Sequence, residues 1–237
     1  RSFGVPDGVN TGNFGLGIVI DFFGFSSKAT GFPVDFAYPS VTALVPANIA
    51  VVKDAPNSEG AVAFVEYLLT PAGQEVLLDP SIMRLPINPA TYASAPEGFP
   101  NPFEDSSIGA TVSFDVAKSG ARYNLVNSMF DVMITYRLDD LRKAVRAVQL
   151  AEEVHANSGN EEANALIAEA RALIEALPID EAQSLNEDFA SIFTKKRKKA
   201  TDTVGQRQAE VEQDWDSMVV ANYRKAKELA EQAASMN

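Results

Sequence analysis

Hydrophobic residues in the second half of the chain recur every three or four positions, the spacing of one buried helix face. This period predicts five helices, at residues 113–134, 137–156, 161–177, 180–199 and 206–235. The second, third and last of these helices each have an apolar stripe that a neighbouring helix of the same chain can cover. The stripes consist of Leu138, Leu141, Val145 and Val148 in the second helix, Leu166, Ala170, Leu173 and Leu177 in the third, and Val211, Trp215, Met218, Tyr223 and Ala226 in the last.

The first 100 residues show short apolar runs between turn residues instead. They hold 10 of the 14 glycines and 11 of the 13 prolines, which interrupt regular structure. The runs predict strands at residues 34–38 and 49–52, with helices at about residues 18–30, 57–69 and 71–78. Asn57 or Ser58 is the predicted N-cap of the middle helix. We therefore expect two domains, an α/β region at residues 1–100 and a helical region at residues 101–237.

The order of motifs between Tyr38 and Pro86 carries a family resemblance. The segment holds Val45-Pro46-Ala47-Asn48, then a capped helix, then Thr70-Pro71-Ala72-Gly73-Gln74, and finally Arg84-Leu85-Pro86. This order resembles the C-terminal half of the periplasmic substrate-binding proteins of ABC transporters, in the cluster that includes iron(III), hexose-phosphate and phosphoglycerate receptors. Residues 122–131 also resemble the C-terminal helices of phosphoglycerate transport regulatory proteins, so the resemblance covers about residues 1–150.

The resemblance implies a fold class, a cellular location and a truncation. The expected fold is α/β, a partial type II periplasmic-binding-protein-like fold with a C-terminal all-helical extension. Such receptors close two lobes on a ligand, and the opening strands of the first lobe are not recognisable here. No signal peptide precedes the turn-rich start at Arg1-Ser2-Phe3. We therefore expect a C-terminal fragment of a periplasmic protein that binds ligand weakly or not at all by itself.

A glycine-rich loop is the first candidate ligand site. The sequence places it before an apolar run that we interpret as a helix, whose N-terminal N–H groups favour an anion. A purely structural turn explains the pattern about equally well, and the loop lacks the Lys-Ser/Thr pair of a P-loop. The candidate ligand-binding residues in this loop are Asn10, Thr11, Gly12, Asn13 and Gly15.

Two further residues are candidates for the same cleft. Asp21 lies within the apolar run, where a charge is costly unless it is paired or solvated. An acidic residue at this place in related sugar-phosphate receptors would face the cleft, whereas a solvent-facing helix position is the competing interpretation. Tyr38 precedes Pro39 at a strand end and either lines the cleft or packs at its rim.

Composition excludes several other function classes. The net charge of −12 disfavours nucleic acid and anionic membranes as partners, and no apolar run is long enough to span a bilayer. The chain has no cysteine and one histidine, His155, which we interpret as a solvated helix residue. The paired tyrosines of iron receptors are absent, so we predict no metal, no cofactor and no catalytic residues. The basic run at residues 195–199 fits a solvated helix end, with a membrane or acidic partner as the alternative.

Together these observations predict a non-enzymatic receptor for a small organic anion of the phosphoglycerate or sugar-phosphate class. It would deliver the anion to a membrane permease or to a sensor protein. The alternative is a helical interaction module, because the helices after residue 150 exceed what a simple receptor needs. In that case the second half would dock on a membrane sensor or transport regulator and report the ligand state.

Overall fold

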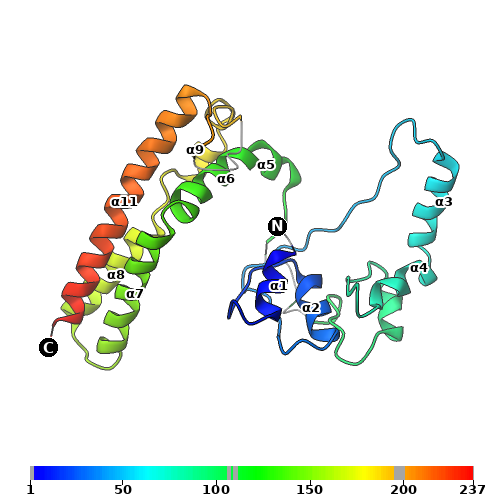
Figure 1. The fold of residues 1–237 in the computed structure, drawn as a ribbon, viewed down its shortest axis with the longest axis horizontal. Coiled ribbons are helices and arrows are strands. Elements are labelled where there is room, and N and C mark those ends of the chain that lie inside the picture. Colours follow the sequence, from blue (N-terminus) through cyan, green and yellow to red (C-terminus); the bar gives the residue numbers. More distant parts are fainter. Residues whose placement is uncertain (1–2, 106–107, 109–111, 195–200, 237) are drawn as a thin grey trace. The chain divides into compact units, whose positions relative to one another are not determined.

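The computed structural model describes residues 3–105, 108, 112–194 and 201–236, and within them every regular element is a helix. Figure 1 follows them along the chain. The first unit contains α1 (Gly4–Asn10), α2 (Asp21–Ala29), α3 (Ser58–Leu68), α4 (Pro71–Glu75), η1 (Val76–Leu78) and η2 (Pro89–Ser94). The second contains α5 (Val116–Ala121), α6 (Tyr123–Phe130), the π-helix η4 (Asp131–Thr135), α7 (Leu138–His155), α8 (Glu161–Glu175), α9 (Glu181–Ser184), α10 (Glu187–Ala190) and α11 (Gln206–Ala234).

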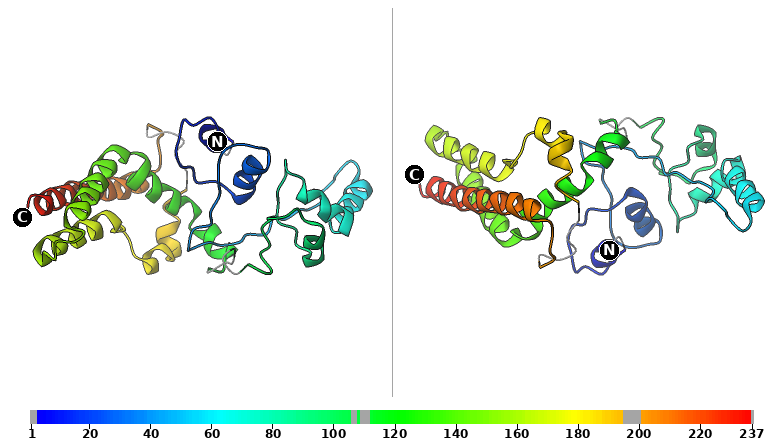
Figure 2. Two further views of the ribbon diagram at one scale, coloured as in Figure 1. Left: turned by 90° about the horizontal axis from the view of Figure 1, so that it is seen from below. Right: turned by 90° about the horizontal axis from the view of Figure 1, so that it is seen from above.

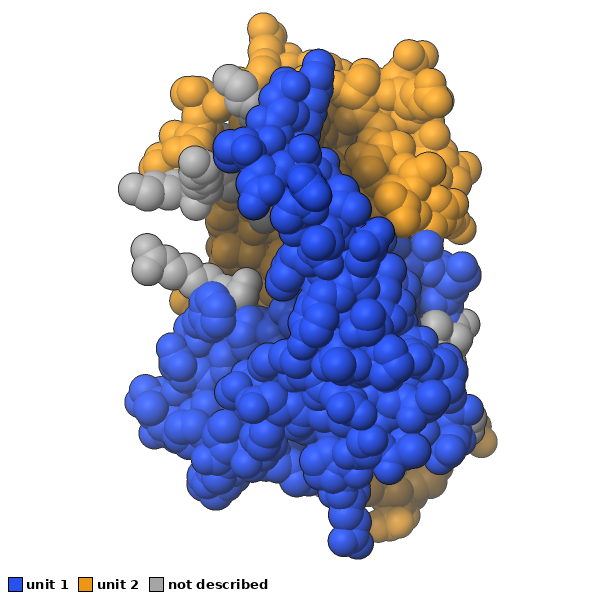
Figure 3. Space-filling view, turned by 90° about the vertical axis from the view of Figure 1, so that its right-hand side faces the viewer, with its two compact units in different colours: residues 1–114 blue, residues 115–237 orange. Residues whose placement is uncertain are grey.

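The chain divides into two compact units, residues 1–114 and residues 115–237, which Figure 3 draws in blue and orange. This division falls later than the change of composition near residue 100. The strands predicted at residues 34–38 and 49–52 are absent from the described residues, where both segments are non-helical chain without ladder partners. The α/β class expected for the first unit is therefore not confirmed by its secondary structure.

The Thr-Pro-x-Gly-Gln motif of the first unit has a structural explanation. Thr70 caps α4 by accepting a hydrogen bond from the Gly73 N–H at 3.1 Å, and Pro71 occupies the first turn. A Cβ atom on Gly73 would lie 2.1 Å from the Tyr67 carbonyl oxygen, so only glycine permits this approach of α3 to α4. The buried Gln74 side chain donates to the Leu68 carbonyl and accepts from the Ile87 N–H. The motif thus joins α3, α4 and the following chain.

Helix predictions in the first unit hold where a cap is present. Asn57 accepts a hydrogen bond from the Gly60 N–H at 3.0 Å, which confirms the predicted N-cap of α3. Pro71 opens α4, and η1 completes the helix expected at residues 71–78. The helix expected from residue 18 begins at Asp21 instead, because Ile20 is still extended. Arg84 lies in non-helical chain between η1 and η2, just after a turn in which Met83 has a positive φ of 49°.

The second unit is a bundle in which α11 packs along both α7 and α8 (Figures 1 and 2). Small side chains take part in this contact, since Ala226, Ala230 and Ala233 of α11 are completely buried. A helix interface lined by alanine allows close backbone approach. The core of this region contains Met133, Ala144, Val148, Ala151, Ala163, Ile167, Ala170, Val219, Tyr223, Ala226, Leu229, Ala230 and Ala233.

The predicted stripes of α7 and α8 mostly face the core. Val148 and Ala170 are buried, and partly buried hydrophobic residues packed against the same core include Leu141, Leu166 and Leu173. Leu138 at the start of α7 and Leu177 beyond the end of α8 are exposed. The stripes omit completely buried alanines, namely Ala144, Ala151 and Ala163. On α11 the prediction is nearly right, since Val211, Trp215 and Tyr223 are buried. Hydrophobicity ranks leucine above alanine as a core residue, but close helix packing favours the smaller side chain.

The predicted helices at residues 113–134 and 180–199 are interrupted. The first becomes α5, α6 and η4, with Arg122 as a non-helical joint between α5 and α6. The second becomes the short helices α9 and α10, capped by Asp180 and Asn186 respectively. The caps begin new helices because each side chain accepts from a backbone N–H three residues later. Residues 195–199, the basic run, lie outside the described residues.

A second core joins α6, α11 and the chain around α10. The indole of Trp215 stacks on the Phe193 ring with a centroid distance of 5.2 Å and an interplanar angle of 14°. Buried polar groups lie beside this core: the Ser128 hydroxyl and the Gln208 amide both donate to Glu212, at 3.0 and 2.7 Å. Arg137 and Asp216 form a bidentate ion pair that links the start of α7 to α11. The hydrogen bond to Asp216 raises the pKa of the Arg137 guanidinium.

His155 corrects the prediction of a solvated helix histidine. Its side chain is buried at the end of α7, with Nε2 2.8 Å from the Ala233 carbonyl oxygen and Nδ1 2.9 Å from the Ser158 hydroxyl. A carbonyl can only accept, so Nε2 carries the proton that is donated to Ala233. The imidazole therefore connects the C-terminal turns of α7 and α11.

We expect His155→Ala to lower the free energy of unfolding by about 1–3 kcal/mol, because the buried Ala233 carbonyl then lacks its donor. Urea denaturation followed by circular dichroism measures this change. Gln149→Ala, on an exposed position of the same helix, is the matched control and should be nearly neutral. Equal effects of the two substitutions would show that the imidazole contact has no special importance.

The alanine contact of α11 predicts a position-dependent response to added volume. Ala226→Leu should destabilise the protein by about 1–3 kcal/mol, because the new side chain has no room between the packed helices. Ala221→Leu adds the same atoms on an exposed face of α11 and should leave stability nearly unchanged. Thermal unfolding of both variants compares them, and similar midpoints would contradict the close contact.

Candidate functional site

The glycine-rich loop follows a helix instead of preceding one. Thr11 is the C-cap of α1, and Gly12 has the left-handed backbone conformation common after a helix end, with φ of 73°. Residues 14–20 then have no regular secondary structure before α2 begins. The loop thus adjoins the carbonyl end of α1, where the partial charge is negative. The helix-dipole argument for anion binding by this loop is therefore wrong.

The polar side chains of the loop form hydrogen bonds with α1, with α2 and with each other. The Thr11 hydroxyl donates to the Asp7 carbonyl at 2.7 Å, and the Asn13 amide donates to the Thr11 hydroxyl at 2.9 Å. The Asn10 amide donates to the buried Ser27 hydroxyl at 3.0 Å and so connects α1 with α2. Gly15 has open space where a side chain would be. A ligand role for these residues remains a prediction.

Asp21 and Tyr38 do lie together, although 17 residues separate them. Asp21 is in the first turn of α2, where a negative charge favours the helix. One carboxylate oxygen accepts the Phe22 N–H at 2.8 Å, and the other accepts the Tyr38 hydroxyl at 2.9 Å. Burial, and then the charge of Asp21, raise the pKa of the Tyr38 phenol far above its usual range. Tyr38 is therefore a protonated donor at neutral pH.

Aromatic rings hold this pair in place. The Tyr38 ring packs edge-on against Phe36 and Phe25, with centroid distances of 5.1 and 5.9 Å. Tyr92 lies close enough for its charge to contribute to the raised pKa of Tyr38. Burial raises the pKa of Tyr92 itself to about 12, and its hydroxyl donates to the Pro86 carbonyl. The segment around residue 86 thus lies beside the Asp21–Tyr38 pair.

Arg84 is the functional candidate that the sequence prediction missed. The centre of its guanidinium lies 3.8 Å from the centroid of the Phe22 ring, a cation–π contact beside Asp21. Arg84 is exposed, and it forms no ion pair with a carboxylate of the described residues. Only four Lys and Arg residues occur among the first 100, and this scarcity of positive charge is the sequence feature that indicates Arg84 as a candidate anion contact.

The three side chains together offer complementary chemistry. The guanidinium of Arg84 presents N–H donors suited to a phosphate or carboxylate group. Asp21 can accept a hydrogen bond from a hydroxyl, and Tyr38 orients its carboxylate. No cluster of three or more His, Asp or Glu side chains suited to a metal ion occurs in the described part of the chain. Nor does any described helix have the length and apolar character needed to cross a membrane.

Comparisons with known proteins identify relatives of this chain. A family model for bacterial extracellular solute-binding proteins matches residues 4–75, which include Asp21 and Tyr38. The phosphoglycerate transport regulatory protein PgtC of Salmonella typhimurium is 30% identical over 197 residues, and PgtC of Salmonella typhi is equally similar. The alignment covers 83% of this chain and 46% of each relative. This chain therefore spans less than half the length of the two curated relatives.

No solved structure matches this chain significantly. The family match and the similarity over most of the chain agree with the resemblance carried by the motifs between Tyr38 and Pro86. The chain is therefore a relative of the bacterial extracellular solute-binding proteins and, over most of its length, of the phosphoglycerate transport regulatory proteins.

Proposed function

We propose that the chain is part of an extracytoplasmic receptor for a small organic anion of the phosphoglycerate or sugar-phosphate class. The observation that carries this proposal is its similarity to a phosphoglycerate transport regulatory protein over 83% of its length. The receptor passes its ligand, or the information that ligand is bound, to a membrane permease of an ABC transporter or to a sensor. It performs no catalysis in this role.

The geometry around Asp21 supports an anionic, hydroxylated ligand. Arg84 supplies a positive charge that no carboxylate of the described residues neutralises, and Asp21 supplies an acceptor for a hydroxyl group. Phosphoglycerates and sugar phosphates carry both a charged group and hydroxyls. Backbone and side-chain groups at the C-terminal end of α1 also contact the ligand, without a contribution from the helix dipole; they belong to Asn10, Thr11, Gly12, Asn13 and Gly15.

We expect weak binding by this chain, with a Kd of about 0.1–1 mM, because the candidate residues are exposed or only half-buried. Two-dimensional amide NMR is suited to such affinities. Titration with 3-phosphoglycerate or glucose 6-phosphate should shift the amides near Asp21, Tyr38 and Arg84, whereas neutral glucose should not. Sub-micromolar binding would instead show that these elements already form a complete cleft.

Arg84→Gln tests the residue that should contact the anion. This substitution should reduce the phosphate-dependent shifts at least about fivefold, since a charge-assisted contact contributes more than a neutral one. Lys53→Gln removes an exposed cation elsewhere in the same unit and serves as the control. If both variants respond to 3-phosphoglycerate as the parent does, the anion does not bind at Arg84.

A second candidate function is a helical interaction module formed by residues 115–237. The observation that favours it is the separate packing of this unit around its own two cores. A unit that buries its own apolar residues can act as a module distinct from the solute site. We propose that it docks on a membrane sensor or transport component.

A further inference from the structure

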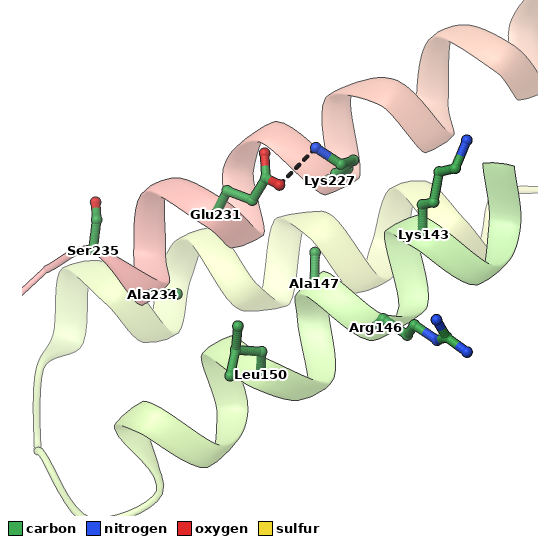
Figure 4. Close-up of a pocket in the computed structure, with 8 residues that line it drawn as sticks. All are labelled: Lys143, Arg146, Ala147, Leu150, Lys227, Glu231, Ala234 and Ser235. Atoms are coloured by element: carbon green, nitrogen blue, oxygen red, sulfur yellow. Dashed lines mark hydrogen bonds and ion pairs between the residues drawn. The ribbon is translucent and has the colours of Figure 1, made fainter.

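A groove runs between α7 and α11 on the helical unit (Figure 4). Its volume is about 500 Å³, within the range of binding sites in proteins. Two helices alone line it, so it is an open furrow along the bundle and not an enclosed cavity. The lining residues are Lys143, Arg146, Ala147, Leu150, Lys227, Glu231, Ala234 and Ser235.

The groove carries positive charge on an acidic protein. Three of its side chains are cations and one is a carboxylate, whereas the whole chain has a net charge of −12. Lys227 is paired with Glu231 at 2.6 Å, drawn as the dashed line in Figure 4. Lys143 and Arg146 form no ion pair within the described residues. Two cations on successive turns of α7 are therefore available to an external anionic group.

The groove also has an apolar floor. Ala147 and Ala234 leave room between the helices because they carry only a methyl group. Leu150 is 55% exposed, and Val154, one turn further along α7, is 49% exposed. α8 packs against both α7 and α11 and covers one side of the contact between them. The groove leaves a further part of this contact open to an additional helix. A small polar anion would leave these side chains uncovered.

We propose that this groove binds an acidic amphipathic helix of a partner protein. Apolar residues of that helix at i, i+3 or i+4, and i+7 lie against Ala147, Leu150 and Ala234, while flanking Asp or Glu residues pair with Lys143 and Arg146. The inference rests on the partner-binding role proposed for residues 115–237 and names its surface. Charge complementarity favours an acidic occupant. A second copy of the chain is also acidic, but it buries the apolar faces of its own α8 and α11, so these faces cannot fill the groove.

A synthetic peptide provides the probe. A fluorescein-labelled helix of about 20 residues, with leucine at the inward positions and glutamate at the others, is titrated with the full chain by fluorescence anisotropy. It should bind in the micromolar range and more weakly at high salt. A scrambled peptide of the same composition, and one with lysine in place of glutamate, should bind at least about tenfold more weakly.

The combined substitution Lys143→Glu with Arg146→Glu should weaken the acidic peptide about tenfold or more. The matched control is Lys53→Glu with Lys225→Glu, which changes the net charge equally at exposed positions outside the groove. The control should change affinity less than about threefold. Leu150→Ala, which alters no charge at a side chain that is 55% exposed, should weaken binding severalfold. Circular dichroism confirms that each variant is folded.

Several outcomes overturn the proposal. The first is that the acidic peptide binds no better than the scrambled peptide. The second is that the groove variant and the control variant lose affinity for the acidic peptide equally. Binding to phosphatidylglycerol vesicles without binding to the peptide identifies a lipid surface instead. A dimer that the groove substitutions dissociate, seen by analytical ultracentrifugation, identifies a second copy. The NMR response to 3-phosphoglycerate in the groove variants should be unchanged, which separates failure of the groove from failure of the solute site.

Discussion

The close packing of α11 against both α7 and α8 is the contact on which the helical unit depends. Ala226, Ala230 and Ala233 are completely buried, so the backbones approach each other and larger residues are excluded. His155 and the Arg137–Asp216 pair add hydrogen bonds near the two ends of this contact. The same close approach creates the α7–α11 groove, since two alanines in its lining leave a furrow where larger side chains would fill the space.

The first unit is organised differently. Its elements are joined by individual side chains, as when Gln74 bridges α3 to the chain at Ile87. Leu78 and Ile108 are its buried large aliphatic residues within the described part of the chain, whereas Leu16 and Ile18 are 86% and 93% exposed. Such a unit gains less from burial of apolar surface than the helical bundle does. Local hydrogen bonds and aromatic contacts therefore have a larger share in positioning Asp21 and Tyr38.

The sequence predicted the features that depend on local chemistry. Asn57 caps α3 and Pro71 opens α4 because a cap or an N-terminal proline acts within one helical turn. The predicted strands are absent for the opposite reason. A strand needs a hydrogen-bonded partner from a distant segment, and residues 49–52 have none in the described chain. The burial of His155 could not be predicted locally, because it depends on Ala233 of α11, 78 residues further along the chain. Helical period located the helices and most of their core-facing positions, but not the buried alanines that close packing selects.

The candidate site shows the same limit. Separate sequence features indicate Asp21 and Tyr38 as candidates, and in the structure the Tyr38 hydroxyl lies 2.9 Å from an Asp21 carboxylate oxygen. The interpretation of the glycine-rich loop depends on which helix end it adjoins; the sequence pattern predicts an N-terminal end, whereas the loop follows the C-terminal end of α1. Arg84 was part of a recognised motif, yet its proximity to Phe22 requires the tertiary fold.

A charge becomes a candidate for ligand binding only when its neighbours are known, because an identical arginine beside a carboxylate would already be neutralised. The groove cations Lys143 and Arg146 follow the same logic: their importance lies in the absence of a described carboxylate partner, which no local pattern on α7 could indicate.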